Sequence, residues 1–269
     1  MPDKPNMVVF RAPENDKFRN FGYRKENTVI DTIVIHYTVC DFTKSYTILT
    51  MPRNVSAHYL IDRDGEIFSL VDEKHVAWHA GLSNWLDKES VNEFSIGIEL
   101  VNSGSNQRVD SSGKLLWDEK DIFPEVQMTS LSQLIGYIKS ENPQIEDRKI
   151  IGHSDITAWN GRRVDPGIAF DWKGLAKNGE GHGLYPKCDT SGLSGEVLYK
   201  FGDSGEKITE LQKNLNRYGY KINIAGSFDD ETQNVVRAFN MHFHTDTENY
   251  YECWDNISEA RLNDLLTQI

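Results

Sequence analysis

The sequence has 269 residues, which is long enough to bury a hydrophobic core and to form one large domain or two smaller ones. Hydrophobic residues make up 38% and charged residues 26%, the balance of a globular protein rather than of a fibrous or disordered one. With 29 basic and 41 acidic residues the formal charge is −12, which argues against nucleic acid as a partner, because phosphate-binding proteins carry a basic surface.

The N-terminal segment, residues 1–27, reads as an extension before the first predicted strand, and it lacks the long apolar stretch of a signal peptide. No run in the sequence approaches the roughly 18 apolar residues that span a bilayer, so we expect no transmembrane segment. The three cysteines, Cys40, Cys188 and Cys253, form no CxxC pair, so neither a disulfide framework nor a thiolate zinc site is predicted.

Residues 28–175 alternate between strand and helix patterns. Short apolar, β-branched runs predict strands at 29–35, 57–61, 66–71, 94–101 and 148–152. The Asp64-Gly65 pair between two of these runs indicates a hairpin. Apolar residues spaced by three and four over 128–138 predict a helix that faces a core. The predicted fold class is therefore α/β, with a mixed central β-sheet flanked by helices.

The remainder of the chain changes in character. Residues 176–197 are rich in glycine and poor in apolar residues, which is typical of a linker. Residues 198–269 predict a small three-helix domain, with apolar faces that include Ile208 and Leu215 on the first helix and Val235 and Phe239 on the second. Asp229 or Asp230 is placed to cap the second helix, and a third is expected over 258–266.

Two histidines and one aspartate are candidates for a metal site. His36 ends the first predicted strand, His153 follows the strand at 148–152, and Asp165 lies twelve residues after His153. Strand ends in an α/β sheet converge on one rim, and two imidazoles with one carboxylate leave the fourth zinc position open to water. The alternative for each histidine is a hydrogen-bonded structural residue.

Glu99 is a charged residue inside the otherwise apolar run FSIGIELV. Alternation along a strand places Gly97, Glu99 and Val101 on one face and the neighbouring isoleucines on the other. Burying an unpaired charge is costly, so this glutamate is either a salt-bridge partner of an arginine or a general base whose pKa is tuned by burial.

Other candidates carry a weaker signal. His58 and His79 are placed to line a cleft, whereas His75 reads as a surface residue. Trp78, Trp85 and Trp159 fit either a hydrophobic core or a wall that faces a sugar. His242 and His244 lie at the end of a predicted helix of the tail, and their spacing is only a weak indication of adventitious metal binding.

Five motifs, in order, resemble the zinc-dependent N-acetylmuramoyl-L-alanine amidases, most closely the branch that is similar to AmpD and AmiD. They are DTIVIHYT, SAHYLIDRDGEIFSLVDEKHVAWHAG, NEFSIGIELVN, IIGHSDI and RVDPGIAFDW, and they cover roughly 28–175. The resemblance implies a zinc site in a groove along a central sheet, with His36, His153 and Asp165 as ligands and Glu99 as the catalytic acid and base. It also implies that His79, Trp78 and His58 contact the substrate.

The sequence departs from the family pattern at one catalytic position. The family places a lysine two residues before the ligand aspartate, where this sequence has Arg163, and the stretch between His153 and Asp165 is about two residues longer than usual. Arginine cannot transfer a proton, but its planar paired donors stabilise an oxyanion. Either Arg162 or Arg163 is then expected to point at the zinc.

The tail resembles the peptidoglycan-binding domain type 1, a three-helix module of cell-wall hydrolases. The resemblance rests on GDSG at 202–205, Leu211-Gln212, Tyr218-Gly219-Tyr220, GSF at 226–228 and Ala238-Phe239, with Asn240 in place of the customary glutamine. It implies peptidoglycan or muropeptides as the binding partner.

Together the resemblances imply hydrolysis, with one Zn²⁺ per chain, of the amide between N-acetylmuramic acid (including its 1,6-anhydro form) and L-alanine. The alternatives are a non-catalytic peptidoglycan recognition protein and a zinc peptidase of the stem peptide. A polymer-binding tail favours the periplasm or cell envelope, with a leader outside this numbering, over the cytoplasm.

Overall fold

A computed structural model of the chain describes residues 2–10, 19–104, 108–109, 115–116, 122–177, 181–245 and 253–269. Parts of the predicted N-terminal extension (11–18) and of the predicted linker (178–180) lie outside the described residues. Among the helices of the described residues, none is both long and apolar enough to cross a membrane.

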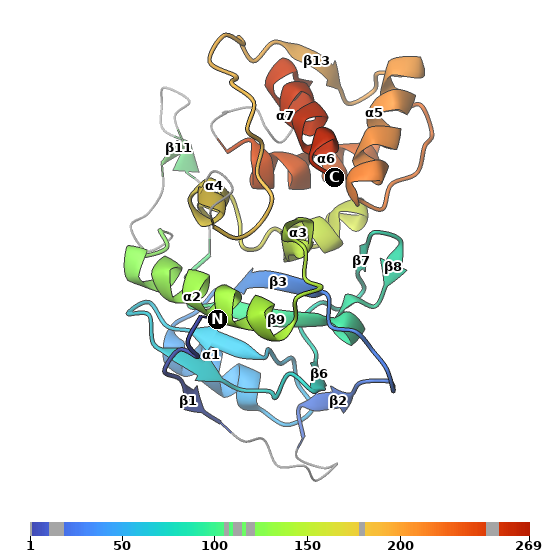
Figure 1. The fold of residues 1–269 in the computed structure, drawn as a ribbon. Helices are drawn as coiled ribbons and strands as arrows, with labels where there is room; N and C mark the ends of the chain where they lie inside the picture. Colours follow the sequence, from blue (N-terminus) through green and yellow to red (C-terminus); the bar gives the residue numbers. More distant parts are fainter. Residues whose placement is uncertain are drawn as a thin grey trace.

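A six-stranded mixed sheet forms the centre of the first domain (Figure 1), in the order β1-β5-β4-β9-β3-β12. Its strands are β1 (Val8–Val9), β3 (Thr32–Tyr37), β4 (Tyr59–Ile61), β5 (Ile67–Ser69), β9 (Ser95–Leu100) and β12 (Ile150–Gly152). The neighbours β4, β9, β3 and β12 run parallel, and β5 is antiparallel to β4 across the predicted hairpin. The predicted mixed α/β class is confirmed, with strand ends shifted by a few residues.

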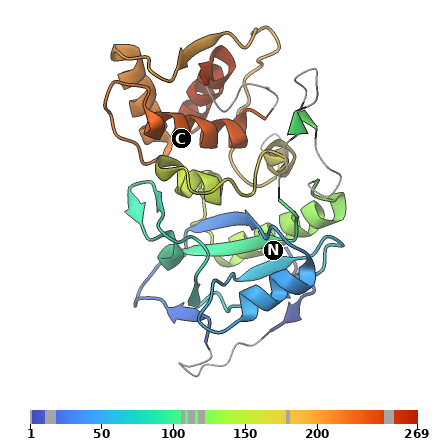
Figure 2. The same ribbon diagram turned by 180° about the vertical axis from the view of Figure 1, so that it is seen from behind.

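The two faces of the sheet are covered by different elements (Figures 1 and 2). Helix α2 (Glu125–Glu141) packs Leu131 and Ile135 against the isoleucines that alternate along β3 and β9. These are Ile33, Ile35, Ile96 and Ile98. Helix α1 (Phe42–Thr50) covers the opposite face beside β4 and β5, where Leu49 contacts Leu60 and Phe68 in a small core. The polar positions of β3 and β9 therefore face away from α2, as strand alternation predicts.

Short elements complete this domain. They are β2 (Phe21–Tyr23), β6 (His75–Ala77), β7 (Asn84–Trp85), β8 (Lys88–Glu89), β10 (Arg108–Val109), β11 (Leu115–Leu116), α3 (His153–Ile156), α4 (Trp172–Ala176) and the 3₁₀ helices η1 (Val91–Phe94), η3 (Asp147–Lys149) and η4 (Ala158–Asn160). Strands β1 and β2 pair with β5 and β6, so the N-terminal segment takes part in the fold. The prediction that His75 is a surface residue is wrong, because its ring is 9% exposed and stacks on Phe21 with 4.1 Å between ring centroids.

The tail contains the three expected helices, α5 (Glu206–Tyr218), α6 (Asp230–Phe243) and α7 (Asn256–Thr267). The side chain of Asp229 accepts the Thr232 amide at the start of α6, which identifies it as the cap. A two-stranded ribbon of β13 (Val197–Lys200) and β14 (Cys253–Asp255) was not predicted.

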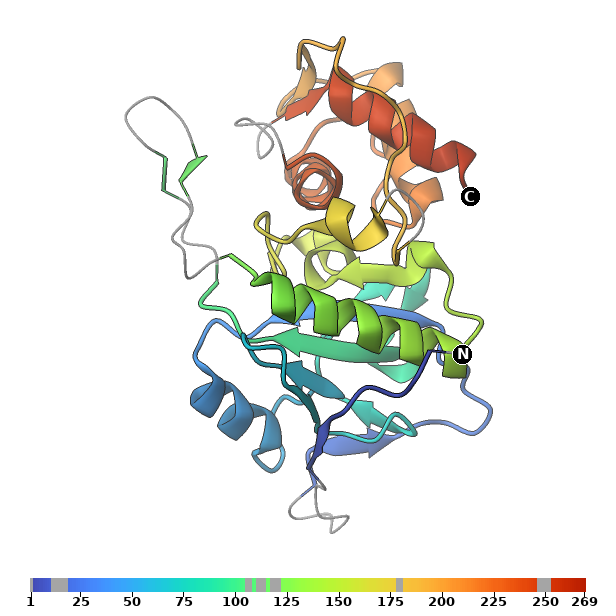
Figure 3. The same ribbon diagram turned by 60° about the vertical axis from the view of Figure 1, so that its left-hand side comes forward.

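The two domains lie against one another (Figure 3) and share one hydrophobic core. Val34 and Ile151 of the sheet and Ile156 of α3 belong to the same buried cluster as Val235 and Phe239 of α6. The described residues of the predicted linker pack against both domains. The His182 amide donates to the Leu175 carbonyl, and the Lys187 amide donates to the Asp264 side chain. The tail is therefore fixed to the face of the sheet opposite α2.

Candidate active site

Strand register brings the three predicted metal ligands together. Gly152 of β12 lies opposite Ile35 of the parallel strand β3. The residues that follow them, His153 and His36, therefore lie side by side. Asp165 returns to the same point because its carbonyl accepts the amide of Ser154, at 2.9 Å. The juxtaposition follows from parallel pairing and from one backbone hydrogen bond.

The three side chains converge through single atoms. His36 Nδ1 lies 3.0 Å from His153 Nδ1 and 3.0 Å from Asp165 Oδ2, and the remaining distance, from His153 Nδ1 to Asp165 Oδ2, is 3.1 Å. All three residues are buried, and their ligand atoms form a group of the size that holds a metal ion. Donors on a tetrahedral zinc are about 3.3 Å apart for bonds of about 2.0–2.1 Å, so the spacing fits Zn²⁺ with little adjustment.

Hydrogen bonds at the far side of each imidazole fix which nitrogen faces the metal position. His153 Nε2 donates to the carbonyl of Ala80 (3.3 Å), an atom that can only accept. His36 Nε2 lies 3.0 Å from His79 Nδ1, and His79 Nε2 lies 3.1 Å from the Ser95 hydroxyl. A metal ion held by the two Nδ1 atoms would leave each Nε2 as the protonated nitrogen, with a partner already in place. Such outer hydrogen bonds hold metal-binding imidazoles in the required tautomer.

Burial sets the charge of these groups. Burial lowers the pKa of His36 to about 4, so its ring is neutral at pH 7. Burial alone would raise the pKa of the Asp165 carboxyl, but the adjacent His153 and His36 rings hold that pKa below its ordinary value. Two imidazole nitrogens and one carboxylate oxygen thus face one another at about hydrogen-bond distance, an arrangement that a cation between them would stabilise.

Glu99 lies beside this cluster on the same face of the sheet, opposite His36 in the register of β9 and β3. Its Oε2 is buried and has no hydrogen-bond partner among the described residues. Burial raises the pKa of its carboxyl to about 8, with a contribution from Asp165, while the charge of Arg163 opposes the shift. Within the described part of the chain no arginine or lysine forms a salt bridge with Glu99, so the geometry favours the general-base interpretation over the ion-pair one.

A cavity of about 240 Å³ opens next to the cluster. Its lining includes Trp78, His79, His153, Arg162 and Arg163. Of the two arginines, Arg163 is the one whose charge acts on both Glu99 and His36. This observation favours Arg163 as the arginine that faces the metal position.

The structure does not place His58 at this cavity. The ring is fully buried, its Nδ1 accepts the Gly97 amide (3.0 Å), and its Nε2 lies 3.2 Å from the carbonyl of His75. Burial also lowers the pKa of His58 to about 3, so the ring is neutral. The ring links Gly97 of β9 to His75 of β6, and the contact of His58 with the substrate stays a prediction.

Sequence reasoning missed the residues that position His79. Asn92 Oδ1 accepts the amides of His79 (3.1 Å) and Ala80 (2.8 Å), which fixes the segment that carries both the ring and the carbonyl used by His153. Gly97 lies under the His79 ring, and a Cβ there would be 2.5 Å from its Cγ. A glycine inside an apolar strand was the available signal, because it marks a close approach by another group.

We expect Gly97→Ala to displace the His79 ring and break its hydrogen bond to His36. The free energy of unfolding should fall by about 1–3 kcal/mol from overpacking, and zinc affinity by about 10-fold to 100-fold from loss of the outer partner. Urea denaturation and competition with a chromophoric chelator measure the two effects. Gly192→Ala is the matched control, since a Cβ at Gly192 has no atom within 4 Å. Wild-type zinc affinity in Gly97→Ala would show that the His79 ring does not support the ligand.

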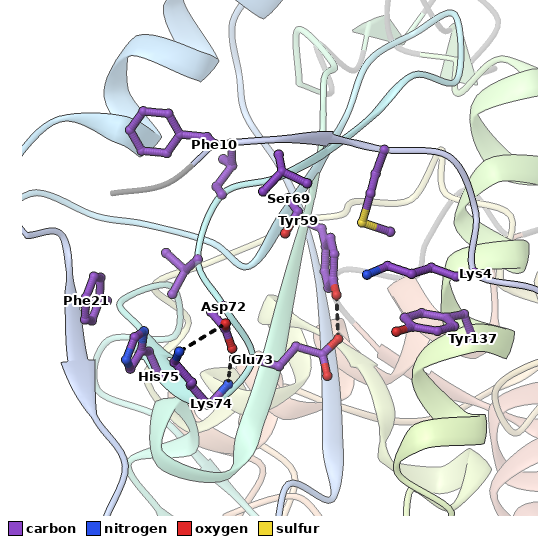
Figure 4. Close-up of a pocket in the computed structure, with 14 residues that line it drawn as sticks. Lys4, Phe10, Phe21, Tyr59, Ser69, Asp72, Glu73, Lys74, His75 and Tyr137 are labelled. Carbon is purple, nitrogen blue, oxygen red and sulfur yellow. Dashed lines mark hydrogen bonds and ion pairs between the residues drawn. The ribbon is translucent and has the colours of Figure 1, made fainter. Parts of the chain in front are cut away.

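A larger cavity, of about 740 Å³, lies apart from this cluster, near the N-terminal segment and α2 (Figure 4). Its acidic side chains are engaged within the pocket, by a hydrogen bond from the Tyr59 hydroxyl to Glu73 (2.5 Å) and an ion pair between Lys74 and Asp72 (3.5 Å). None of the predicted metal ligands lines it. Volume alone therefore does not identify the reaction centre.

Comparisons with known proteins agree with the geometry. Residues 26–168 match the family model described as N-acetylmuramoyl-L-alanine amidase, and residues 204–246 match that described as "Putative peptidoglycan binding domain". The amidase AmiD of Escherichia coli is 34% identical over 223 residues, covering 80% of this chain and 75% of AmiD.

Two solved structures resemble the whole chain. One is AmiD of E. coli in complex with its substrate anhydro-N-acetylmuramic acid-L-Ala-D-γ-Glu-L-Lys (TM-score 0.72, 30% identity, 91% of this chain and 92% of that one). The other is AmpDh3 of Pseudomonas aeruginosa in complex with anhydromuramic pentapeptide (TM-score 0.71, 30% identity, 91% of this chain and 96% of that one).

Proposed function

Because the chain belongs to the N-acetylmuramoyl-L-alanine amidase family, we propose that it hydrolyses the amide bond between N-acetylmuramic acid, including the 1,6-anhydro form, and L-alanine, using one Zn²⁺ per chain. The observation that carries the proposal is the convergence of His36 Nδ1, His153 Nδ1 and Asp165 Oδ2 beside Glu99, whose Oε2 has no hydrogen-bond partner in the described part of the chain. A metal position and a proton acceptor, side by side, are what metal-assisted hydrolysis of an amide requires.

In this proposal His36, His153 and Asp165 would hold the ion, which when bound would supply Lewis acidity and lower the pKa of a water molecule toward about 7. Glu99 accepts a proton at Oε2 as the water attacks the lactyl carbonyl, and then returns that proton to the leaving amine of L-alanine. Its raised pKa suits both directions of transfer.

Arg163 and the cavity wall have binding roles. The guanidinium of Arg163 donates to the oxygen that gains negative charge as the carbonyl is attacked, an electrostatic role that needs no proton transfer. Trp78 and His79, which line the cavity, form the wall against which the substrate lies. An arginine thus takes the place of the family's lysine.

Mass spectrometry of a purified anhydro-muropeptide, incubated with the protein with and without a zinc chelator, tests the proposal. We expect an intact peptide that begins with L-alanine to be released, and release to stop on chelation and resume when Zn²⁺ is restored. A shortened peptide would instead identify a peptidase. Zinc binding without any cleavage would identify a recognition protein.

We also propose that residues 28–175 form the catalytic domain and 198–269 a peptidoglycan-binding domain, joined by 176–197. The match of 204–246 to a peptidoglycan-binding family supports this division. A polymer-binding tail is useful where the polymer is, so we propose the periplasm or cell envelope as the site of action. A muropeptide-recycling role in the cytoplasm is the competing assignment, and cell fractionation distinguishes the two.

A further inference from the structure

Two of the three metal ligands lie on one short segment, residues 153–165, which is formed by α3, η4 and a turn. Such short helices are not stable by themselves, so their position depends on what packs against them. The Asp155 side chain of α3 makes polar contacts with the C-terminal domain, and Asp155 is 1% exposed.

The Asp155 carboxylate is satisfied by three hydrogen bonds. Oδ1 accepts the hydroxyl of Tyr220 (2.7 Å), and Oδ2 accepts His242 Nδ1 (2.9 Å) and the amide of Gly152 (2.8 Å). Tyr220 and His242 belong to the C-terminal domain and are themselves buried. Removing hydrogen-bond donors from a buried carboxylate destabilises the folded chain, because the cost of desolvating the charge is no longer offset. The Tyr220 and His242 side chains therefore determine where Asp155 can lie.

Asp155 is tied directly to the ligands. Its hydrogen bond to Gly152 closes the turn that carries His153, and Thr157 donates its hydroxyl to the carbonyl of His153 (2.9 Å). The next amide, that of Ser154, donates to the carbonyl of Asp165. A shift of α3 therefore moves His153 and Asp165 together.

Helix α6 also holds the other end of the segment. Arg237 donates to the carbonyl of Gly161 (3.1 Å), just before the two cavity arginines. Gly161 packs so closely on Asn234 that a Cβ would lie 2.5 Å from its Oδ1. His242, besides binding Asp155, stacks on Trp172 with 3.7 Å between ring centroids.

We infer that the C-terminal domain is a positioning element of the metal centre: Tyr220 and His242, by holding Asp155, fix α3 and with it the ligands His153 and Asp165. The inference rests on the proposed zinc site and adds a role for the tail that is separate from binding a polymer. Ligands held in place before the metal arrives bind it more tightly than ligands that must be ordered on binding, and loss of an outer partner costs about 10-fold to 100-fold in metal affinity.

The test uses the full-length chain and its Tyr220→Phe variant, which removes one donor and keeps the ring. Zinc dissociation constants are measured by competition with a chromophoric chelator, and thermal unfolding of the zinc-free protein is followed in parallel. We expect zinc to bind about 10-fold to 100-fold more weakly to Tyr220→Phe. Turnover should recover substantially at saturating zinc, because Glu99 and the cavity are unchanged.

Tyr218→Phe is the matched control, since Tyr218 is buried in the same domain but packs against Trp85 and Phe243. Its zinc affinity should equal that of the wild type. Equal zinc affinity in Tyr220→Phe and wild type, or equal losses in both tyrosine variants, would overturn the positioning role and leave the proposed function standing. A wild-type chain that binds no zinc would overturn the proposed function and this inference with it.

His242 provides an independent variant. His242→Phe keeps an aromatic ring on Trp172 and removes the donor, so it should weaken zinc binding as Tyr220→Phe does. His242→Asn places an amide donor near the former Nδ1 and should restore part of the affinity despite losing the stacked ring. If His242→Asn binds zinc no better than His242→Phe, the hydrogen bond to Asp155 is not what positions the ligands.

Discussion

Asp165→Asn is expected to abolish stoichiometric zinc binding and, with it, amide hydrolysis. The substitution keeps the size of the side chain but removes the only negative charge among the three converging atoms. Two imidazoles would remain, and burial lowers the pKa of the His36 ring to about 4, so that ring adds no charge that could replace the carboxylate. Metal content by atomic absorption and turnover of anhydro-muropeptide measure the two losses.

Asp171→Asn is the matched control for that experiment. Asp171 is an exposed aspartate six positions along the chain, and its carboxylate caps α4 by accepting the Gly174 amide. The control should lose about 0.5–2 kcal/mol of stability at most and keep its zinc. An Asp165→Asn protein that retains full zinc and turnover would remove Asp165 from the ligand set.

Glu99→Gln should leave zinc bound and lower turnover by about 10²-fold to 10⁴-fold, the range for loss of a general base. The amide of glutamine fills the same space and accepts a hydrogen bond, but it cannot take up the proton of the attacking water. Single-turnover kinetics at saturating zinc isolate this step from metal binding. Near-normal rates in the zinc-loaded variant would contradict the role proposed for Glu99.

The same variant should also be more stable than the wild type when zinc is removed. A carboxyl whose native pKa is raised to about 8 binds its proton more tightly in the folded than in the unfolded chain. The Glu99 carboxyl therefore contributes to the free energy of unfolding at acidic pH, and this contribution is lost as pH rises from about 4.3 through 8. Thermal unfolding of the chelated proteins should show the advantage of Glu99→Gln growing over that interval.

Alternation along strands made part of the site predictable. The apolar positions of β9 face α2, so Glu99 had to face the other way, and the parallel neighbour β3 presents His36 on that same face. Strand ends in an α/β sheet meet on one rim, and this rule alone predicts that His153 lies near His36. These are local rules, and they need only a correct assignment of strands.

The parts that could not be predicted depend on contacts between distant residues. His58 and His79 look alike in sequence, and only the packing of Gly97 against the His79 ring and the burial of His58 separate a cavity residue from a structural one. His242 is 87 positions from Asp155, and no sequence motif around either residue indicates that the two are in contact. Periodicity located the helix of His242 correctly and gave no information about its partner.

The hydrophobic core that the two domains share limits how this chain can change over evolutionary time. Where a hydrolase and a wall-binding module are joined by a loose tether, one module can be exchanged for another without harm to catalysis. Here an exchanged tail would expose Val34, Ile151 and Ile156 and would remove the donors of Asp155. A change in the surface of α6 is therefore expected to require a matching change in the segment that carries His153.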